Sequence, residues 1–244
     1  MNYEVKEPDI NPVKKQNKRV FLSLVGDVFS SKFVIALFST VGSMLRDNIY
    51  DINIITWSDT NMTKARLTAL GTSVVDGVDQ RPFGRDDYDY WISIESNCIF
   101  SADSVIELLK SLEDHPVVTG LYRIDLDRFN VVDKWDVDYF RKNGAYEMTT
   151  LTNMDEWKKN NPTNKHRKIC STGMGFLGMR KEVLTAMKYP YFNGDMSTVF
   201  TEEGKVLTSL MSDEMAFSKN VQKAGFSIVA NTDLVVGYER KFII

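Results

Sequence analysis

The chain has 244 residues and a formal net charge of −3, with 43% hydrophobic and 26% charged residues. This length and apolar content favour one large α/β domain with a proper core over two small domains. The nearly balanced charge excludes a general electrostatic attraction to nucleic acid or to an anionic membrane, so either partner would need a local patch.

No segment reaches the roughly 18 apolar residues that a membrane-spanning helix needs, and the N-terminal residues lack the hydrophobic region of a signal peptide. We therefore expect a soluble, cytoplasmic protein. Cys98 and Cys170 are too few and too far apart to suggest a disulfide framework, and both lie in apolar surroundings. The sequence predicts two buried free thiols.

The chain begins with a polar segment, residues 1–18, that we interpret as a flexible arm. Val20–Val25 is an apolar run typical of a central strand. Ser30 or Ser31 can then cap a helix over roughly residues 32–44. The apolar side chains at helical spacing, which we expect to face the core, are Phe33, Ala36, Leu37, Val41 and Leu45.

A second strand is predicted over Asp51–Trp57, followed by a helix over about residues 62–70 that ends at Gly71. Arg66 lies in this helix. Two interpretations remain open: a solvated surface arginine, or a charge aimed at a phosphate or at neighbouring carboxylates.

The stretch Tyr88–Phe100 reads as a buried strand that ends in three polar residues, Glu95-Ser96-Asn97. Ser101 then has the position of an N-cap for a helix with leucines at helical spacing. A strand, a polar triplet at its carboxyl end and a helix form the geometry of a ligand site in an open α/β sheet. A strand end with no further role is the alternative.

A further strand is predicted over residues 116–122, so strands and helices alternate about three times in the first half. This alternation predicts a mainly parallel central sheet flanked by helices. Residues 123–168 are less regular and contain a basic stretch at 158–168. Such long irregular segments are often binding loops.

Glycines 173, 175 and 178 interrupt an apolar run at residues 169–179. They indicate either close approach of a ligand to the backbone or tight sheet packing. Ser212 is a good N-cap, which places Asp213 and Glu214 in the first turn of a helix. Residues 226–230 are the last predicted core strand.

Four sequence segments carry a resemblance to a known family. In chain order they are Thr60–Arg66; Trp91–Phe100; Thr172–Phe176 with Arg180–Leu184; and Asp213–Phe217 with Ala224–Phe226. In this order and spacing they resemble the small GT-A-fold glycosyltransferases found in phages, large viruses and bacteria. The resemblance spans roughly residues 19–238. It matches a helix near the nucleotide, the strand that ends in the family's Asp-x-Asp motif, a glycine-rich acceptor-side strand, and the helix that supplies the base in inverting members.

The resemblance implies a single GT-A (Rossmann-like) domain over residues 19–244, with a nucleotide-sugar-binding half (19–122) and an acceptor-binding half (123–244). It implies transfer of a sugar from a nucleotide-diphosphate sugar to a hydroxyl acceptor, in the host cytoplasm if the protein is viral. The residues that we expect to bind the donor are Ser23, Arg66, Glu95, Ser96, Asn97 and Arg240. Those that we expect to bind the acceptor are Tyr122, Gly173 and Gly175.

Glu214, with Asp213 before it, stands at the position of the family's catalytic base, which needs a pKa raised by partial burial. Helix-capping carboxylates without catalytic function are the alternative, and a retaining mechanism would give both residues other roles. Trp135 and Trp157, like Tyr122, are either sugar-stacking platforms or core aromatics.

The chain departs from the family pattern at three places. Glu95-Ser96-Asn97 stands in place of the Asp-x-Asp motif, and Asp213-Glu214 stands in place of the Glu-Asp pair. Tyr238 replaces the histidine that often ends the last strand of the family. Glu95 and Asn97 would still offer oxygen ligands to Mn²⁺ or Mg²⁺, with less negative charge than two aspartates, so we expect weaker binding. Alternatively, Glu95 and Ser96 bind the ribose hydroxyls, and Arg240 or Lys241 supplies the counter-charge.

Two other functions stay open beside a glycosyltransferase. The first is a catalytically silent relative that binds a nucleotide sugar or a glycan. The second is a phage enzyme whose acceptor is DNA, which only the basic stretch at 158–168 supports.

Overall fold

The computed structural model describes residues 17–84, 87–192, 194, 196–201 and 203–239. Residues 1–16 of the predicted arm therefore lie outside the described residues, as do Arg240 and Lys241.

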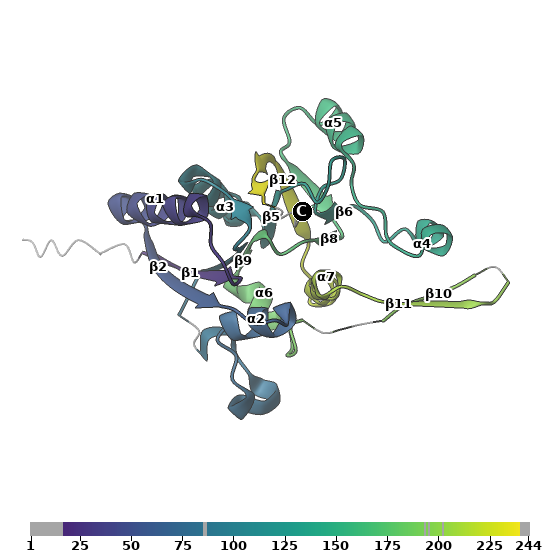
Figure 1. Ribbon diagram of the computed structural model, residues 1–244, viewed down its shortest axis with the longest axis horizontal. Helices are drawn as coiled ribbons and strands as arrows, with labels where there is room; N and C mark the ends of the chain where they lie inside the picture. Colours follow the sequence, from purple (N-terminus) through teal and green to yellow (C-terminus); the bar gives the residue numbers. More distant parts are fainter. Residues whose placement is uncertain (1–16, 85–86, 193, 195, 202, 240–244) are drawn as a thin grey trace, which may run out of the picture.

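The first half alternates strands and helices as predicted (Figure 1). Its elements are β1 (Lys18–Val25), α1 (Ser31–Asp47), β2 (Tyr50–Trp57), α2 (Met62–Ala69), the 3-10 turns Val74–Asp79 and Pro82–Gly84, β3 (Tyr90–Glu95), β4 (Cys98–Ile99), α3 (Ala102–Asp114) and β5 (Val117–Leu121). Those of the second half are β6 (Val131–Val132), α4 (Val137–Asn143), α5 (Leu151–Asn160), β7 (His166–Ile169), β8 (Ser171–Thr172), β9 (Phe176–Arg180), α6 (Lys181–Ala186), β10 (Met196–Phe200), β11 (Val206–Leu210), α7 (Asp213–Lys223), β12 (Ile228–Val235) and β13 (Gly237–Tyr238).

Seven strands form the central sheet in the order β2-β1-β3-β9-β5-β12-β7. β1 pairs in parallel with both β2 and β3, and β5 pairs in parallel with β12. β9 and β7 run against the other strands. The predicted fold class, a mixed α/β arrangement with a mainly parallel sheet flanked by helices, is confirmed.

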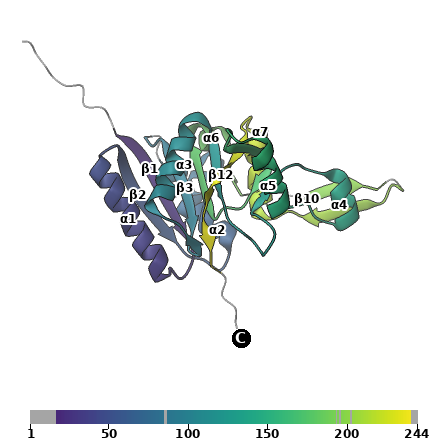
Figure 2. The same ribbon diagram turned by 90° about the horizontal axis from the view of Figure 1, so that it is seen from above.

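Helices cover both faces of this sheet (Figures 1 and 2). α1 and α3 pack on one face, where Leu22 and Leu24 of β1 point, while α2, α6 and α7 pack on the face that carries Phe21. Successive side chains of a strand point to opposite faces, so one apolar run supplies both cores.

The predicted helix N-caps are confirmed, because each side-chain oxygen accepts a hydrogen bond from a backbone N–H in the first turn. They are Ser101 for α3, Ser212 for α7 and, of the two serines considered for α1, Ser30. Asn61 caps α2 in the same way.

The predicted apolar stripe of α1 is wrong at its C-terminal end. The buried positions are Phe33, Ala36, Thr40 and Met44, whereas Leu45 is 64% exposed. The polar Thr40 is accepted in the core because its hydroxyl donates to the Ala36 carbonyl at 2.8 Å. A hydroxyl satisfied within its own helix costs little on burial.

The second half contains more regular structure than predicted. Residues 123–168 include two helices, α4 and α5, and the β10–β11 hairpin projects beside α4. The prediction for the cysteines is half right, since Cys98 is buried and Cys170 is half-buried. Within the described residues, no helix is long and apolar enough to cross a membrane.

Candidate active site

A cavity of about 910 Å³ opens at the carboxyl ends of β1 and β3. Val25 and Gly26 line it from the end of β1, and Glu95 and Ser96 line it from the end of β3. β2 and β3 lie on opposite sides of β1, so the direction in which the chain crosses the sheet reverses between β1 and β3. This switch point is where open α/β sheets bind their ligands.

Gly26 allows the turn after β3 to lie against the turn after β1. Its φ of 145° is one that side-chain-bearing residues rarely adopt, and a Cβ there would overlap the Ser96 hydroxyl. The Ser96 N–H donates to the Val25 carbonyl at 2.9 Å, which fixes the two turns together.

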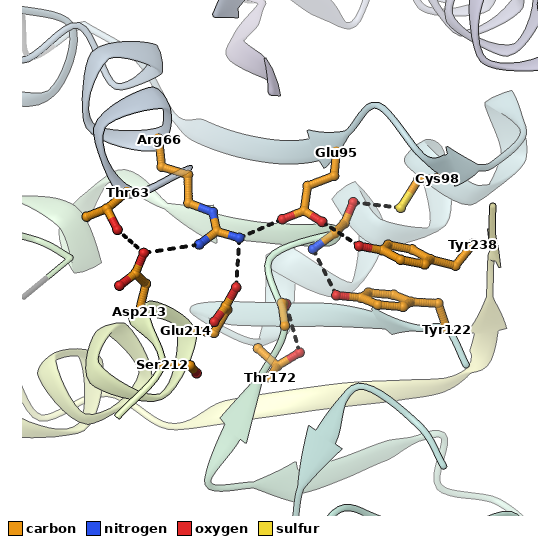
Figure 3. A network of polar contacts seen from close by, with 12 residues as sticks. Thr63, Arg66, Glu95, Cys98, Tyr122, Thr172, Ser212, Asp213, Glu214 and Tyr238 are labelled. Carbon is orange, nitrogen blue, oxygen red and sulfur yellow. Dashed lines mark hydrogen bonds and ion pairs between the residues drawn. The ribbon is translucent and has the colours of Figure 1, made fainter. Parts of the chain in front are cut away.

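Arg66 of α2 lies at the centre of the site and is only 4% exposed. One guanidinium nitrogen donates to Glu95 Oε1 at 2.7 Å and to Glu214 Oε1 at 2.8 Å, as Figure 3 shows. The other terminal nitrogen lies 3.8 Å from Asp213 Oδ2. The interpretation of Arg66 as a surface arginine is wrong, since its charge points at the neighbouring carboxylates.

Three carboxylates thus share one guanidinium. Burial alone would raise the pKa of the Glu214 carboxyl, but the charge and hydrogen bond of Arg66, with further hydrogen bonds, outweigh it and hold that pKa below its ordinary value. Burial and the nearby charge of Glu214 raise the pKa of Asp213. The predicted upward shift for a base therefore falls on Asp213 and not on Glu214.

Asp213 stands slightly apart from the cavity. Its carboxylate accepts a hydrogen bond from the Thr63 hydroxyl of α2, whereas Glu214 lines the cavity itself. The geometry favours Glu214, and the pKa shift favours Asp213. We give geometry the greater weight, because a base must first reach the proton that it takes.

A stacked pair of tyrosines forms the wall beside Glu95. The Tyr238 hydroxyl donates to Glu95 Oε2 at 2.9 Å, and the Tyr122 and Tyr238 rings lie 4.6 Å apart at 8°. Burial, followed by the charge of Glu95, raises the pKa of both hydroxyls. Tyr238 therefore stays protonated and remains a donor to Glu95.

The sequence predicted Glu95 and Asn97 as ligands of Mn²⁺ or Mg²⁺, and both line the cavity. Asn97 Oδ1 is buried without a hydrogen-bond partner, which is compatible with an oxygen that coordinates a cation. Both Glu95 oxygens already meet donors, and the described part of the chain holds no group of three or more His, Cys, Asp or Glu that could bind an ion. The two residues fit a hard cation only if ligand phosphates and water complete its shell, as is usual for Mg²⁺.

Most of the predicted site residues lie around this one cavity. Those that line it are Arg66, Glu95, Ser96, Asn97, Tyr122, Gly173 and Glu214.

Ser23 does not belong to the site. Its hydroxyl is fully buried, donates to the Ala69 carbonyl and accepts from Trp91 Nε1, both at 2.9 Å. The prediction that Ser23 binds the donor is wrong, because Ser23 lies two positions before the end of β1 and its side chain points into the core. The predicted donor contact of Arg240 lies outside the described residues.

Gly173 and Gly175 serve the packing of Tyr122. A Cβ on Gly173 would overlap the Tyr122 hydroxyl, and a Cβ on Gly175 would lie 2.8 Å from its ring. Gly175 does not line the cavity, and its N–H donates to the Tyr122 hydroxyl at 3.1 Å. The prediction of an acceptor contact at Gly175 is therefore replaced by the packing alternative.

Sequence reasoning missed the polar residues on the far side of the cavity, Asn130, Ser171 and Thr172. Asn130 Nδ2 donates to Thr172 Oγ1 at 3.2 Å, and its Oδ1 accepts from the Tyr122 N–H at 2.9 Å. The signal was available, since Asn130 is a single amide inside the apolar run 129–132.

The two tryptophans and the basic stretch lie away from the cavity. Trp135 Nε1 donates to Gln222, and Trp157 packs under the Arg167 guanidinium. Lys158, Lys165 and Arg167 each form an ion pair with a carboxylate. The charges that suggested a DNA acceptor are thus largely used within the protein.

The chain matches no model of a known protein family and no curated protein. Among solved structures, it resembles the protein A197 from STIV at 14% identity and a TM-score of 0.44, over 92% of this chain and 96% of that one. It also resembles a candidate UDP-N-acetylglucosamine pyrophosphorylase from Entamoeba histolytica at 9% identity and a TM-score of 0.32, over 92% of this chain and 74% of that one. At these values neither likeness assigns a family or an activity to the chain.

Proposed function

We propose that the protein is a glycosyltransferase that moves a sugar from a nucleotide-diphosphate sugar to a hydroxyl acceptor. The observation that carries this proposal is a cavity at the β1/β3 switch point that holds two carboxylates from opposite sides, Glu95 and Glu214, joined by Arg66. Such transfer needs counter-charge for a departing diphosphate and a base for the acceptor proton, and the cavity offers both.

The donor occupies the side formed by β1, β3 and the start of α1. Ser30, the N-cap of α1, lines the cavity, and the first turn of α1 has no acidic residue. The positive end of this 17-residue helix therefore borders the site and favours the diphosphate. On this side, Glu95 and Ser96 can bind the ribose hydroxyls of the donor.

Glu95 and Asn97 are the residues that would hold Mn²⁺ or Mg²⁺ together with diphosphate oxygens. A bound cation would stabilise the charge that develops on the leaving diphosphate.

Glu214 takes the proton of the acceptor hydroxyl. In a direct displacement, the hydroxyl oxygen forms its bond to the anomeric carbon while the bond from that carbon to the diphosphate oxygen breaks, and the electron pair leaves with the diphosphate. Because Arg66 lowers the pKa of Glu214, the carboxylate is ionised at neutral pH but is a weak base. A diphosphate that draws Arg66 away from Glu214 would strengthen the base only when the donor is bound.

A screen of nucleotide sugars tests the proposal. UDP-, GDP-, dTDP- and CMP-sugars are each added with Mn²⁺ and with EDTA, and thermal stability and calorimetric heat are recorded. We expect one nucleotide to bind and its sugar to be slowly hydrolysed without acceptor. Absence of binding by every donor in both conditions would refute the proposal.

A catalytically silent nucleotide-sugar-binding protein is the second candidate. The contacts of Arg66 with both carboxylates favour it, since they occupy the groups that catalysis needs. Donor binding without any hydrolysis or transfer would decide for this alternative.

A further inference from the structure

Part of the cavity wall beside Glu214 is apolar, although the polar Ser171 and Ser212 also line the cavity nearby. Val132 of β6, Met148 and Met215 of α7 line the cavity there, and none of these side chains carries a charge or a hydrogen-bonding hydrogen. Met215 directly follows Glu214 in α7, so the apolar wall begins next to the candidate base.

The three side chains belong to one continuous apolar cluster. Val132 is 1% exposed and lies in a core cluster with Phe140, Tyr146 and Val199, against which Met148 and Met215 pack. We call Val132, Met148 and Met215 the methionine wall. Because its back is packed against α4 and the β10–β11 hairpin, the wall is part of the folded core and not a set of loose surface side chains.

The other side of the cavity is chemically different. Apolar side chains line it too, but it carries Arg66 and Glu95, the charged groups that suit a charged, hydroxyl-rich donor. A polar donor gains nothing from an aliphatic surface, whereas an apolar group placed there leaves water. Neither Trp135 nor Trp157 is among the described residues that line the cavity, and the tyrosines that do line it, Tyr122 and Tyr238, form the wall beside Glu95.

We infer that the acceptor is a hydroxyl compound with an apolar alkyl or aryl group, which the methionine wall binds while the hydroxyl meets Glu214. This inference rests on the proposed function and names the class of its acceptor. Unbranched methionine side chains adapt to ligands of different shape, so the wall selects for apolar character more than for one outline. The cavity volume of about 910 Å³ lies near the upper end of ligand sites and suits a donor and an acceptor side by side.

A chain-length series tests this inference. Methyl, butyl, hexyl and octyl β-glucosides, each below its micelle-forming concentration, are titrated into the protein and followed by calorimetry. We expect Kd to fall about two- to fourfold for each added methylene until the wall is covered. Equal Kd values for methyl and octyl glucosides would overturn the inference.

Met148→Gln and Met215→Gln place amides on the wall at nearly constant volume and should flatten the dependence on chain length. Met196→Gln is the matched control, because Met196 lies on β10, is 52% exposed and does not line the cavity. Loss of the chain-length dependence in Met196→Gln but not in the wall variants would place the alkyl chain on the hairpin and would overturn the inference.

Nucleotide-sugar binding is measured in the same samples. This second measurement distinguishes a failure of the proposed glycosyltransferase function from a failure of the apolar acceptor site. Donor binding and hydrolysis with no effect of chain length would leave the proposed function standing and remove the apolar acceptor. A chain-length effect that depends on Met148 and Met215, without binding of any donor, would support the apolar site and remove the glycosyltransferase.

Discussion

Arg66 shows how one buried charge organises the site at the scale of single residues. Its partners Glu95 and Glu214 lie 29 and 148 positions away in the sequence. The sequence around Arg66 predicts a helix, but it does not show which distant residues contact the side chain. The sequence alone therefore did not decide whether Arg66 is buried or exposed. A buried guanidinium is tolerated only when carboxylates pair with it.

Replacement of Arg66 by methionine should destabilise the fold by about 3 kcal/mol, because the buried Glu95 and the half-buried Glu214 lose their counter-charge. Urea denaturation at pH 7 measures the change. Arg128→Met is the matched control, since the Arg128 side chain is 54% exposed in its pair with Asp125, and we expect little effect there.

The same variant should show a defined pH dependence. The fold lowers the pKa of Glu214, so the stability from ionised Glu214 is fully present above the ordinary carboxyl range and disappears as pH falls through the lowered pKa. The difference in unfolding free energy between the wild type and Arg66→Met should therefore be largest near neutral pH and shrink below about pH 4. A difference that grows on acidification would contradict the assigned direction.

Asn97 is the residue that separates a weak cation site from a strong one. Asn97→Asp adds a second carboxylate beside Glu95 at constant size, at a position where the Asn97 Oδ1 has no hydrogen-bond partner. We expect roughly tenfold tighter Mn²⁺ binding in the presence of nucleoside diphosphate, because cation affinity rises with ligand charge. Calorimetric titration of Mn²⁺ checks this, and unchanged affinity would argue against Asn97 as a ligand.

At the scale of elements, glycines set how closely strands and side chains approach. Gly175 lies just before β9 and against the Tyr122 ring, whereas a Cβ added to Gly42, in the middle of α1, would point into open space. The sequence does not distinguish the two glycines, because the contact of Gly175 with Tyr122 joins residues that are 53 positions apart.

Gly175→Ala should therefore cost about 1–3 kcal/mol of stability, because its new Cβ would press on the Tyr122 ring. Gly42→Ala should stabilise the protein by about 0.5–1 kcal/mol through helix propensity. Thermal unfolding of the two variants gives the comparison, and equal effects would contradict the packing function of Gly175.

Local signals explain which elements the sequence predicts. Helix caps such as Ser30 and Ser212, and the apolar runs of β1 and β3, depend on neighbours within a few residues and were predicted correctly. The β10–β11 hairpin was missed because apolar residues lie on both of its faces. One face packs on α4, but the exposed face also carries large apolar side chains, among them Phe200 and Leu210.

At the scale of the whole molecule, the sheet order places the site. The strand–helix alternation predicts a mainly parallel sheet, and the position of β1 between β2 and β3 then puts the ends of β1 and β3 at one cavity. The position of Glu95 at the end of the apolar strand β3 correctly predicted that it lies at this cavity. The burial of Ser23 follows from strand direction and side-chain alternation, which the sequence pattern of β1, apolar on both faces, does not reveal.

The central claim is that Glu95 serves the donor and Glu214 serves the acceptor proton across one cavity. With the nucleotide sugar identified by the screen, Glu95→Gln and Glu214→Gln provide matched variants, since both remove one charge from the same Arg66 and keep the shape. The exposed Glu156→Gln on α5 is the control.

Calorimetric donor binding and turnover, measured on the same preparations, test this claim most directly. We predict that Glu214→Gln keeps its donor Kd within about twofold but loses about 100- to 10,000-fold in turnover, and that Glu95→Gln weakens donor binding about tenfold or more. Full turnover by Glu214→Gln, or equal loss of donor binding in both variants, would contradict the division of labour between the two carboxylates.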